Sequence, residues 1–190
     1  SSDVCSSDLM IKDVPTEEIP SLRDNGEFYI EPIMGTYYVT FNTRKAPFND
    51  ARVREALSLA IDRTHVANVI MGGTYSPAKN FVGPGVSDAA KGSSFERVTT
   101  ETYGDYFGTD YAADLARAKA LLADAGYPDG KGFPVFEYLT NDAGYHKAVA
   151  EYLQAAYAEL GLTMNVNIQE WKTVTADRRS GNFDVARNGW

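Results

Sequence analysis

Two arginines near the carboxyl end of the chain have the type and position best suited to chemistry, and that chemistry is the recognition of an anion. Arg187 closes the run 183–188, in which Phe183, Val185 and Arg187 alternate onto one face. A guanidinium group stays charged and is costly to desolvate alone, so Arg187 must meet an anion or lie at an opening to water. An internal pair with a carboxylate would satisfy a lone arginine equally well. Three further residues in this stretch favour a ligand that carries a carboxylate: Trp171, Arg178 and Trp190.

Other residue patterns that suggest chemistry are incomplete. Residues 76–79 have the Ser-x-x-Lys spacing of penicillin-interacting enzymes, but they stand in a segment rich in proline and glycine and lack the companion motifs. Gly83-Pro84-Gly85 begins like a dinucleotide-binding loop, but Asp88 stands where the third glycine belongs. The two histidines, His65 and His146, are far apart in the sequence, which argues against a metal site. We therefore expect no catalysis, no cofactor and no bound metal.

The composition is that of a globular chain of 190 residues, which suits one domain or one lobe of a larger protein. Its 44% hydrophobic and 23% charged residues are ordinary values. A net charge of -8 argues against nucleic acid or an anionic membrane surface as a partner. No apolar run approaches the ~20 residues that a membrane helix needs. Cys5 is the single cysteine, so an internal disulfide is excluded.

The first nine residues, SSDVCSSDL, do not look like part of a folded protein. They repeat Ser-Ser-Asp and lack the charged and then apolar pattern of a secretion signal. They are more similar to translated adapter sequence, so we expect residues 1–9 to be a non-native tail and the natural amino terminus to lie elsewhere.

Five short runs predict the strands that would position these residues. Leu162, Met164, Val166 and Ile168 alternate with polar residues, which is the pattern of a strand with one buried face. The predicted strands are residues 28–32, 36–42, 132–140, 162–168 and 183–188.

Helices are predicted between the strands, and four of them have an aspartate as the expected N-cap. A short helix or turn is expected in 14–23, and longer helices after the N-caps Asp50, Asp62, Asp110 and Asp142. The second of these would carry Val66, Val69 and Ile70 on its apolar face, and a short helix is expected between Trp171 and Arg179. Residues 74–108 are predicted to form one long loop. This alternation of elements predicts an α/β fold with a largely parallel or mixed sheet flanked by helices.

Three segments, in this order, resemble the oligopeptide- and dipeptide-binding proteins of ABC transporters: 36–63, 118–128 and 169–190. The run Glu170-Trp171-Lys172-Thr173, together with the closing Ala186-Arg187-Asn188-Gly189-Trp190, is most similar to oligopeptide binders of the Gram-negative periplasm within extracellular solute-binding family 5. The resemblance covers the chain from about residue 14 to its last residue.

The resemblance implies one lobe of a two-lobed periplasmic-binding-protein type II fold, which closes on an extended peptide. Residues 10–35 would be a crossover or hinge segment from the other lobe, and residues 36–190 a C-terminal ligand-binding lobe, truncated at its end. The implied partners are oligopeptides and ABC permease subunits, without nucleic acid or membrane insertion. The implied protein is a monomer in the periplasm, or a cell-surface lipoprotein in a Gram-positive source.

The resemblance also implies the roles of single residues. Arg178 and Arg187 match basic residues that meet the carboxylate of the peptide, and His146 matches a histidine with a similar role for longer ligands. Four matches form the walls and the backbone of the pocket: Trp171 and Trp190 as aromatic walls, Gly189 as backbone that faces the ligand, and Tyr38 as a pocket tyrosine. The aspartate that anchors the amino group of the ligand lies past Trp190 in the family.

Some of the family pattern is absent, and alternatives stay open. Ile33 and Thr40 stand where oligopeptide binders often have Tyr and Glu, which leaves the shape of the pocket near Tyr38 undecided. The same lobe could serve as a ligand-sensing module. As a receptor it could take dipeptides, metal complexes or oligosaccharides, because relatives with these motifs take each of them.

Overall fold

The computed structural model of the chain describes residues 14–26, 29–30, 33–104, 107 and 110–190. The predicted tail at 1–9 lies outside the described residues. Only Tyr29 and Ile30 of the predicted strand at 28–32 are described, and neither is in a strand. The helix expected in 14–23 is present as α1, Ile19–Asp24, and its Arg23 donates a hydrogen bond to the carbonyl of Gly72 at 3.1 Å.

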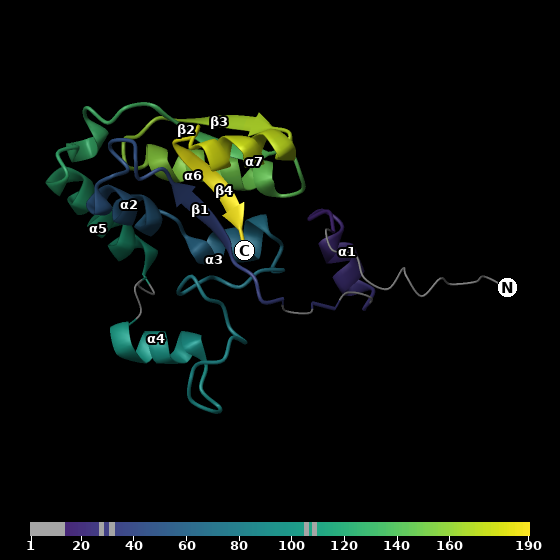
Figure 1. The fold of residues 1–190 in the computed structure, drawn as a ribbon. Coiled ribbons are helices and arrows are strands. Elements are labelled where there is room, and N and C mark those ends of the chain that lie inside the picture. The colour runs from purple at the N-terminus through teal and green to yellow at the C-terminus, as the bar shows by residue number, and fades with distance from the viewer. Residues whose placement is uncertain (1–13, 27–28, 31–32, 105–106, 108–109) are drawn as a thin grey trace.

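A four-stranded mixed sheet forms the centre of the fold (Figure 1). Its order is β1-β4-β2-β3: Tyr37–Phe41, Val185–Gly189, Phe136–Asn141 and Met164–Gln169. β4, β2 and β3 run parallel, whereas β1 is antiparallel to β4 and pairs Tyr37 with Gly189 and Val39 with Arg187. The prediction of an α/β fold with a mixed sheet is confirmed.

Helices connect the strands and cover both faces of the sheet (Figure 1). After α1, the described helices are α2 Ala51–Leu59, α3 Arg63–His65, a π-helical segment Val66–Ile70, α4 Phe95–Tyr103, α5 Tyr111–Asp124, a 3-10 turn Pro128–Gly130, α6 His146–Ala158 and α7 Trp171–Ser180.

Two apolar clusters lie on opposite faces of the sheet. The larger cluster packs α2, α5 and α6 against one face, where Tyr138, Leu153 and Tyr157 are fully buried. Burying an apolar side chain of this size contributes roughly 1.5–3 kcal/mol, so this side supplies most of the stability of the lobe. The smaller cluster packs Val174 of α7 against Leu139 and Ala186 on the other face.

Three of the four predicted aspartate caps are confirmed. Asp50, Asp62 and Asp110 accept backbone hydrogen bonds in the first turns of α2, α3 and α5 at 2.9, 2.9 and 3.0 Å. The fourth prediction is wrong, because α6 begins only at His146 and Asp142 does not cap it. The chain first turns between residues 141 and 146, where the N–H of Ala143 donates to the carbonyl of Asn141 at 3.2 Å.

Two further predictions fail where the local pattern carried too little information. The predicted loop 74–108 contains α4, which Ser94 caps by accepting from the N–H of Arg97 at 3.2 Å. No side chain of α4 is buried, so the helix forms without packing into the core, and the proline- and glycine-rich sequence around it favoured a loop. Val69 is 65% exposed, because the α-helical turn passes into a π-helical segment and the apolar face rotates away.

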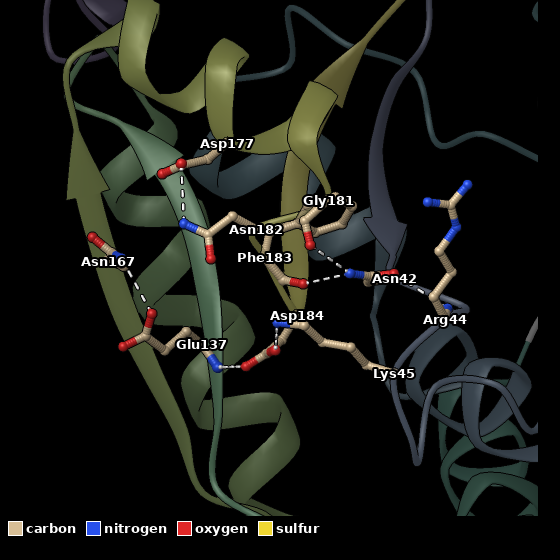
Figure 2. A network of polar contacts seen from close by, with 10 residues as sticks. All are labelled: Asn42, Arg44, Lys45, Glu137, Asn167, Asp177, Gly181, Asn182, Phe183 and Asp184. Atoms are coloured by element: carbon tan, nitrogen blue, oxygen red, sulfur yellow. Dashed lines mark hydrogen bonds and ion pairs between the residues drawn. The ribbon is translucent and has the colours of Figure 1, made fainter.

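A polar network fixes the start of β4 against β1 and β2 (Figure 2). The side-chain amide of Asn42 donates to the carbonyls of Gly181 at 3.0 Å and Phe183 at 2.8 Å. Asp184 accepts from Lys45 at 2.9 Å and from the N–H of Glu137 at 3.1 Å. Phe183 is therefore held in a bend ahead of β4, and it packs with the Ala186 cluster. The prediction that Phe183 shares a face with Val185 and Arg187 is wrong.

Candidate ligand-binding site

The candidate site lies where the parallel strands end and the next helices begin. β2 leads into α6 and β3 into α7, so His146 and Trp171, the first residues of these helices, lie at the same edge as Arg187 near the end of β4. β1 runs the opposite way and begins at this edge with Tyr37. The carboxyl ends of the strands are the usual place for ligands in open α/β sheets.

A hollow of about 400 Å³ opens on the α7 side of this edge. Its lining comes from β1, α7 and the two ends of β4: Thr40, Trp171, Thr175, Arg178, Arg179, Phe183, Asn188 and Gly189. Three of the predicted site residues, Trp171, Arg178 and Gly189, line it. Two arginines in one lining make the hollow suited to an anion.

Arg187 lies on the opposite face of the sheet from the hollow, with the α6 side chains. Its Cζ is 5.4 Å from the ring centroid of Tyr37 and 5.0 Å from that of Trp171. Both distances are within the range of cation–π attraction. Trp171 thus has two neighbours of the predicted set, because it lines the hollow beside Arg178 and also packs against Arg187.

His146 joins the same group from the start of α6. It is buried, and its ring stacks on Tyr37 with centroids 5.5 Å apart and planes inclined by 19°. His146, Tyr37, Arg187 and Trp171 therefore form a row in which each side chain contacts the next, and we call this the Arg187 row.

Arg178 and Arg187 have no acidic partner in the part of the chain that the structure describes. The buried Nε of Arg187 makes no hydrogen bond of good geometry among the described residues. Burial lowers the pKa of Arg178; Tyr38 opposes this, and the charges of Arg187 and Arg179 add to it. An arginine fork that lacks an internal acid can accept a carboxylate through two parallel charge-assisted hydrogen bonds.

The remaining predicted site residues, Tyr38, Gly189 and Trp190, do not form one group in the structure. Tyr38 packs edge-to-face on Phe81 at 4.9 Å. Gly189 lines the hollow, but its N–H donates to Oδ1 of Asn188 at 2.9 Å. Trp190 is 87% exposed and does not line the hollow, although its backbone exchanges two hydrogen bonds of 3.0 Å with Thr36. The ligand-binding roles of all seven residues stay predictions.

Sequence reasoning missed Tyr37, Thr175 and Asn188. Thr175 could have been found, because Trp171, Thr175 and Arg178 have the i, i+4, i+7 spacing of one helix face. Tyr37 could not, because alternation assigns it to the core face with Val39, and only strand pairing brings it beside Arg187.

Two further features can be checked in the described part of the chain. No group of three or more His, Cys, Asp or Glu side chains there has the arrangement of a metal site. No described helix has both the length and the apolar character needed to cross a membrane.

Comparison with known proteins identifies relatives of the chain. It is 35% identical over 186 residues to the periplasmic oligopeptide-binding protein OppA of Salmonella typhimurium. This alignment covers 96% of the chain and 32% of the relative. The structure of the Escherichia coli murein tripeptide binding protein MppA matches with a TM-score of 0.78 at 31% identity, over 94% of this chain and 33% of that one. Haemophilus influenzae OppA in complex with the peptide RPPGFSPFR matches with a TM-score of 0.75 at 28% identity, over 93% and 34% of the two chains.

These matches confirm the predicted lobe of a periplasmic binding protein, and the chain spans about a third of the length of its relatives. The relatives are solute-binding proteins and not enzymes, as the sequence led us to expect. The profile of the bacterial extracellular solute-binding proteins, family 5 Middle, matches residues 6–190. The chain therefore belongs to family 5 of the bacterial extracellular solute-binding proteins.

Proposed function

We propose that the protein containing this chain captures oligopeptides and delivers them to the permease of an ABC transporter. The observation that carries the proposal is that Arg187, near the carboxyl end of β4, and Arg178, in the hollow on the α7 side, both lack a carboxylate partner among the described residues. A guanidinium that is partly removed from water without an anionic partner carries a desolvation cost, which an anionic ligand would offset. The carboxylate terminus of a peptide is such an anion.

The two arginines serve peptides of different length. Arg178 faces the hollow on the α7 side, whereas Arg187 lies on the α6 side, so the two offer carboxylate sites at different positions on the lobe. His146 adds a third site for longer ligands, and Trp171 packs against the backbone or side chains of the peptide. Each charge-assisted hydrogen bond contributes about 1.5–3 kcal/mol.

The rest of the protein completes the site. Residues 36–190 form one lobe, residues 10–35 connect it to a second lobe, and hinge motion closes the two around the peptide. Trp190 and the backbone of Gly189 face the ligand in that closed state, and Tyr38 forms part of a side-chain pocket. The protein works as a monomer, without a cofactor, in the periplasm or as a lipoprotein on the cell surface.

Two alternatives to peptide capture must be tested: binding of a ligand that is not a peptide, and a role as a ligand sensor. Relatives include a probable deoxycholate-binding periplasmic protein and a heme-binding protein A, so carboxylate-bearing ligands other than peptides are included in the test. A ligand-sensing module of the same fold would bind peptides as well, but it would not support peptide uptake in cells that lack their own peptide receptor.

A thermal-shift screen of the complete protein tests the proposal. Peptides of two to eight residues are compared with their C-terminal amides, free amino acids, oligosaccharides and deoxycholate. Binding raises the unfolding free energy by RT ln(1 + [L]/Kd), so the free-acid peptides should raise Tm most. A larger shift with sugars or deoxycholate than with every peptide would contradict the proposal.

A further inference from the structure

Tyr37 is the one member of the Arg187 row that the proposed function does not use. It is absent from the lining of the hollow, and it lies between two residues of the candidate site. Its ring contacts His146 on α6 and Arg187 on β4, and it also meets Tyr145 edge-on with centroids 6.0 Å apart. Tyr145 also meets His146 edge-on, with centroids 4.9 Å apart, so Tyr37 lies within an aromatic group beside Arg187.

Strand pairing explains how Tyr37 reaches Arg187. Tyr37 stands opposite Gly189, and Val39 stands opposite Arg187, so Tyr37 and Arg187 are diagonal neighbours on one face of the antiparallel pair. Diagonal neighbours are about 7–8 Å apart, within reach of an aromatic side chain. Gly189 has no side chain to occupy the space opposite Tyr37, which leaves the ring free to lie toward the guanidinium.

The burial of the row gives this contact its importance. The Nε of Arg187 and the hydroxyl of Tyr37 are both buried, and neither makes a hydrogen bond of good geometry among the described residues. Burial raises the pKa of the Tyr37 hydroxyl, and the nearby Tyr138 and Arg187 oppose this rise. No described carboxylate pairs with the guanidinium, and the rings of Tyr37 and Trp171 both lie within cation–π range of it. Cation–π attraction from two rings at once favours one orientation of a long side chain over others.

We propose that Tyr37 is a positioning residue: its ring holds the guanidinium of Arg187 against Trp171, so that affinity for a ligand with a free carboxylate depends on Tyr37. This inference rests on the proposed function, and it extends that function to a residue behind the ligand-facing side chains. The ring is the part that acts. Tyr37→Phe should therefore preserve the position of Arg187. Tyr37→Leu keeps an apolar side chain but removes the π face, so it should not.

The test uses the complete protein and compares Tyr37→Leu with Tyr37→Phe. Phe41→Leu is the matched control, because Phe41 lies on the same strand and the same face but stacks on Phe48, away from the row. Calorimetry measures each affinity for a peptide with a free carboxylate and for its C-terminal amide. We expect Tyr37→Leu to lower the preference for the free acid about tenfold, and Tyr37→Phe and Phe41→Leu to retain it. The loss should vanish in an Arg187→Ala background, since the two residues act together.

A second measurement separates this inference from the proposed function. The Nε–H signal of Arg187, assigned by its disappearance in Arg187→Ala, reports the guanidinium by NMR without any ligand. We expect its exchange with solvent to be about tenfold faster in Tyr37→Leu and unchanged in Tyr37→Phe. An Arg187 signal that does not respond to Tyr37→Leu overturns the positioning role, even if peptide binding is normal. Equal affinity of the wild-type protein for acid and amide overturns the proposed carboxylate site instead, and with it any effect of Tyr37 on binding.

Discussion

The side-chain amide of Asn42 donates to the backbone carbonyl of Phe183 at 2.8 Å, and this bond joins the end of β1 to the bend before β4. The same amide reaches the carbonyl of Gly181 at 3.0 Å, and the side chain of Asn42 is 7% exposed. One buried residue therefore sets the register of the two strands that carry Tyr37 and Arg187 to the opposite end of the sheet.

Replacing Asn42 by alanine should destabilise the lobe by about 1–3 kcal/mol, because it leaves two partly buried carbonyls without their donor. Urea denaturation of the complete protein, followed by tryptophan fluorescence, measures the change. Asn182→Ala is the control, since its amide bonds only the side chain of Asp177 at an exposed position and its loss should cost less than about 0.5 kcal/mol. Equal effects of the two variants would contradict the role given to Asn42.

Loss of the Asp184 side chain should destabilise the lobe more than loss of its ion pair with Lys45 alone. The pair is partly exposed, with side-chain exposures of 44% for Lys45 and 26% for Asp184, so Lys45→Met should cost less than about 1 kcal/mol. Asp184→Ala removes the acceptor of the Glu137 N–H as well, and we expect a loss of about 1–3 kcal/mol. Denaturation midpoints in low and high salt check this, because only the contribution of Lys45 should fade as salt rises.

The two arginines should discriminate peptides by length. Arg178→Ala and Arg187→Ala should each weaken binding by about 10- to 100-fold, for different sets of peptide lengths, because each removes charge-assisted bonds to one position of the carboxylate. Calorimetry on peptides of graded length measures this. Arg97→Ala is the control, because it breaks only exposed contacts on and just before α4, with Glu101 and Ser93. Unchanged affinities at all lengths in both site variants would exclude arginine recognition of the carboxylate.

The isolated chain should bind peptides weakly or not at all, because the second lobe supplies the rest of the site. Calorimetry compares the affinity of the isolated chain with that of the complete protein, for the peptide that the complete protein binds most tightly. Affinity as tight as that of the complete protein would show that this division of the site between two lobes is wrong.

Alkaline pH should destabilise the lobe through its buried tyrosines. Burial, followed by the nearby Tyr152 and Glu159, raises the pKa of Tyr111 from 10.0 to about 12. The folded state then binds more protons than the unfolded state between pH 10 and 12, so stability falls as pH rises through this range. Tyr111→Phe should flatten that fall in urea titrations, and Tyr103→Phe, at an 83% exposed position, should leave it unchanged.

Sequence patterns predicted the elements whose period or caps are strong. The N-cap Asp50 and the apolar spacing after it correctly predicted α2. The β-branched and aromatic run at 36–42 correctly predicted β1. Weak patterns failed for physical reasons. α4 has no buried face, and Ile168 is 39% exposed although it continues the alternation of β3, because β3 is an edge strand.

The candidate site was predictable in its residue types but not in its arrangement. Arginine and tryptophan near the carboxyl end suggested a carboxylate ligand, and the structure places Trp171 and Arg178 in one hollow. That Arg187 lies across the sheet from Arg178, with Tyr37 as its neighbour, depends on the pairing of strands about 150 residues apart in sequence. Local periodicity carries no information about such pairing.

The two backbone hydrogen bonds between Thr36 and Trp190 have a mechanical consequence. They bring the beginning and the end of the 36–190 segment to adjacent points on one side of the sheet. Force applied through residues 36 and 190 would therefore load the bonds between β1 and β4 one after another, beginning at this corner.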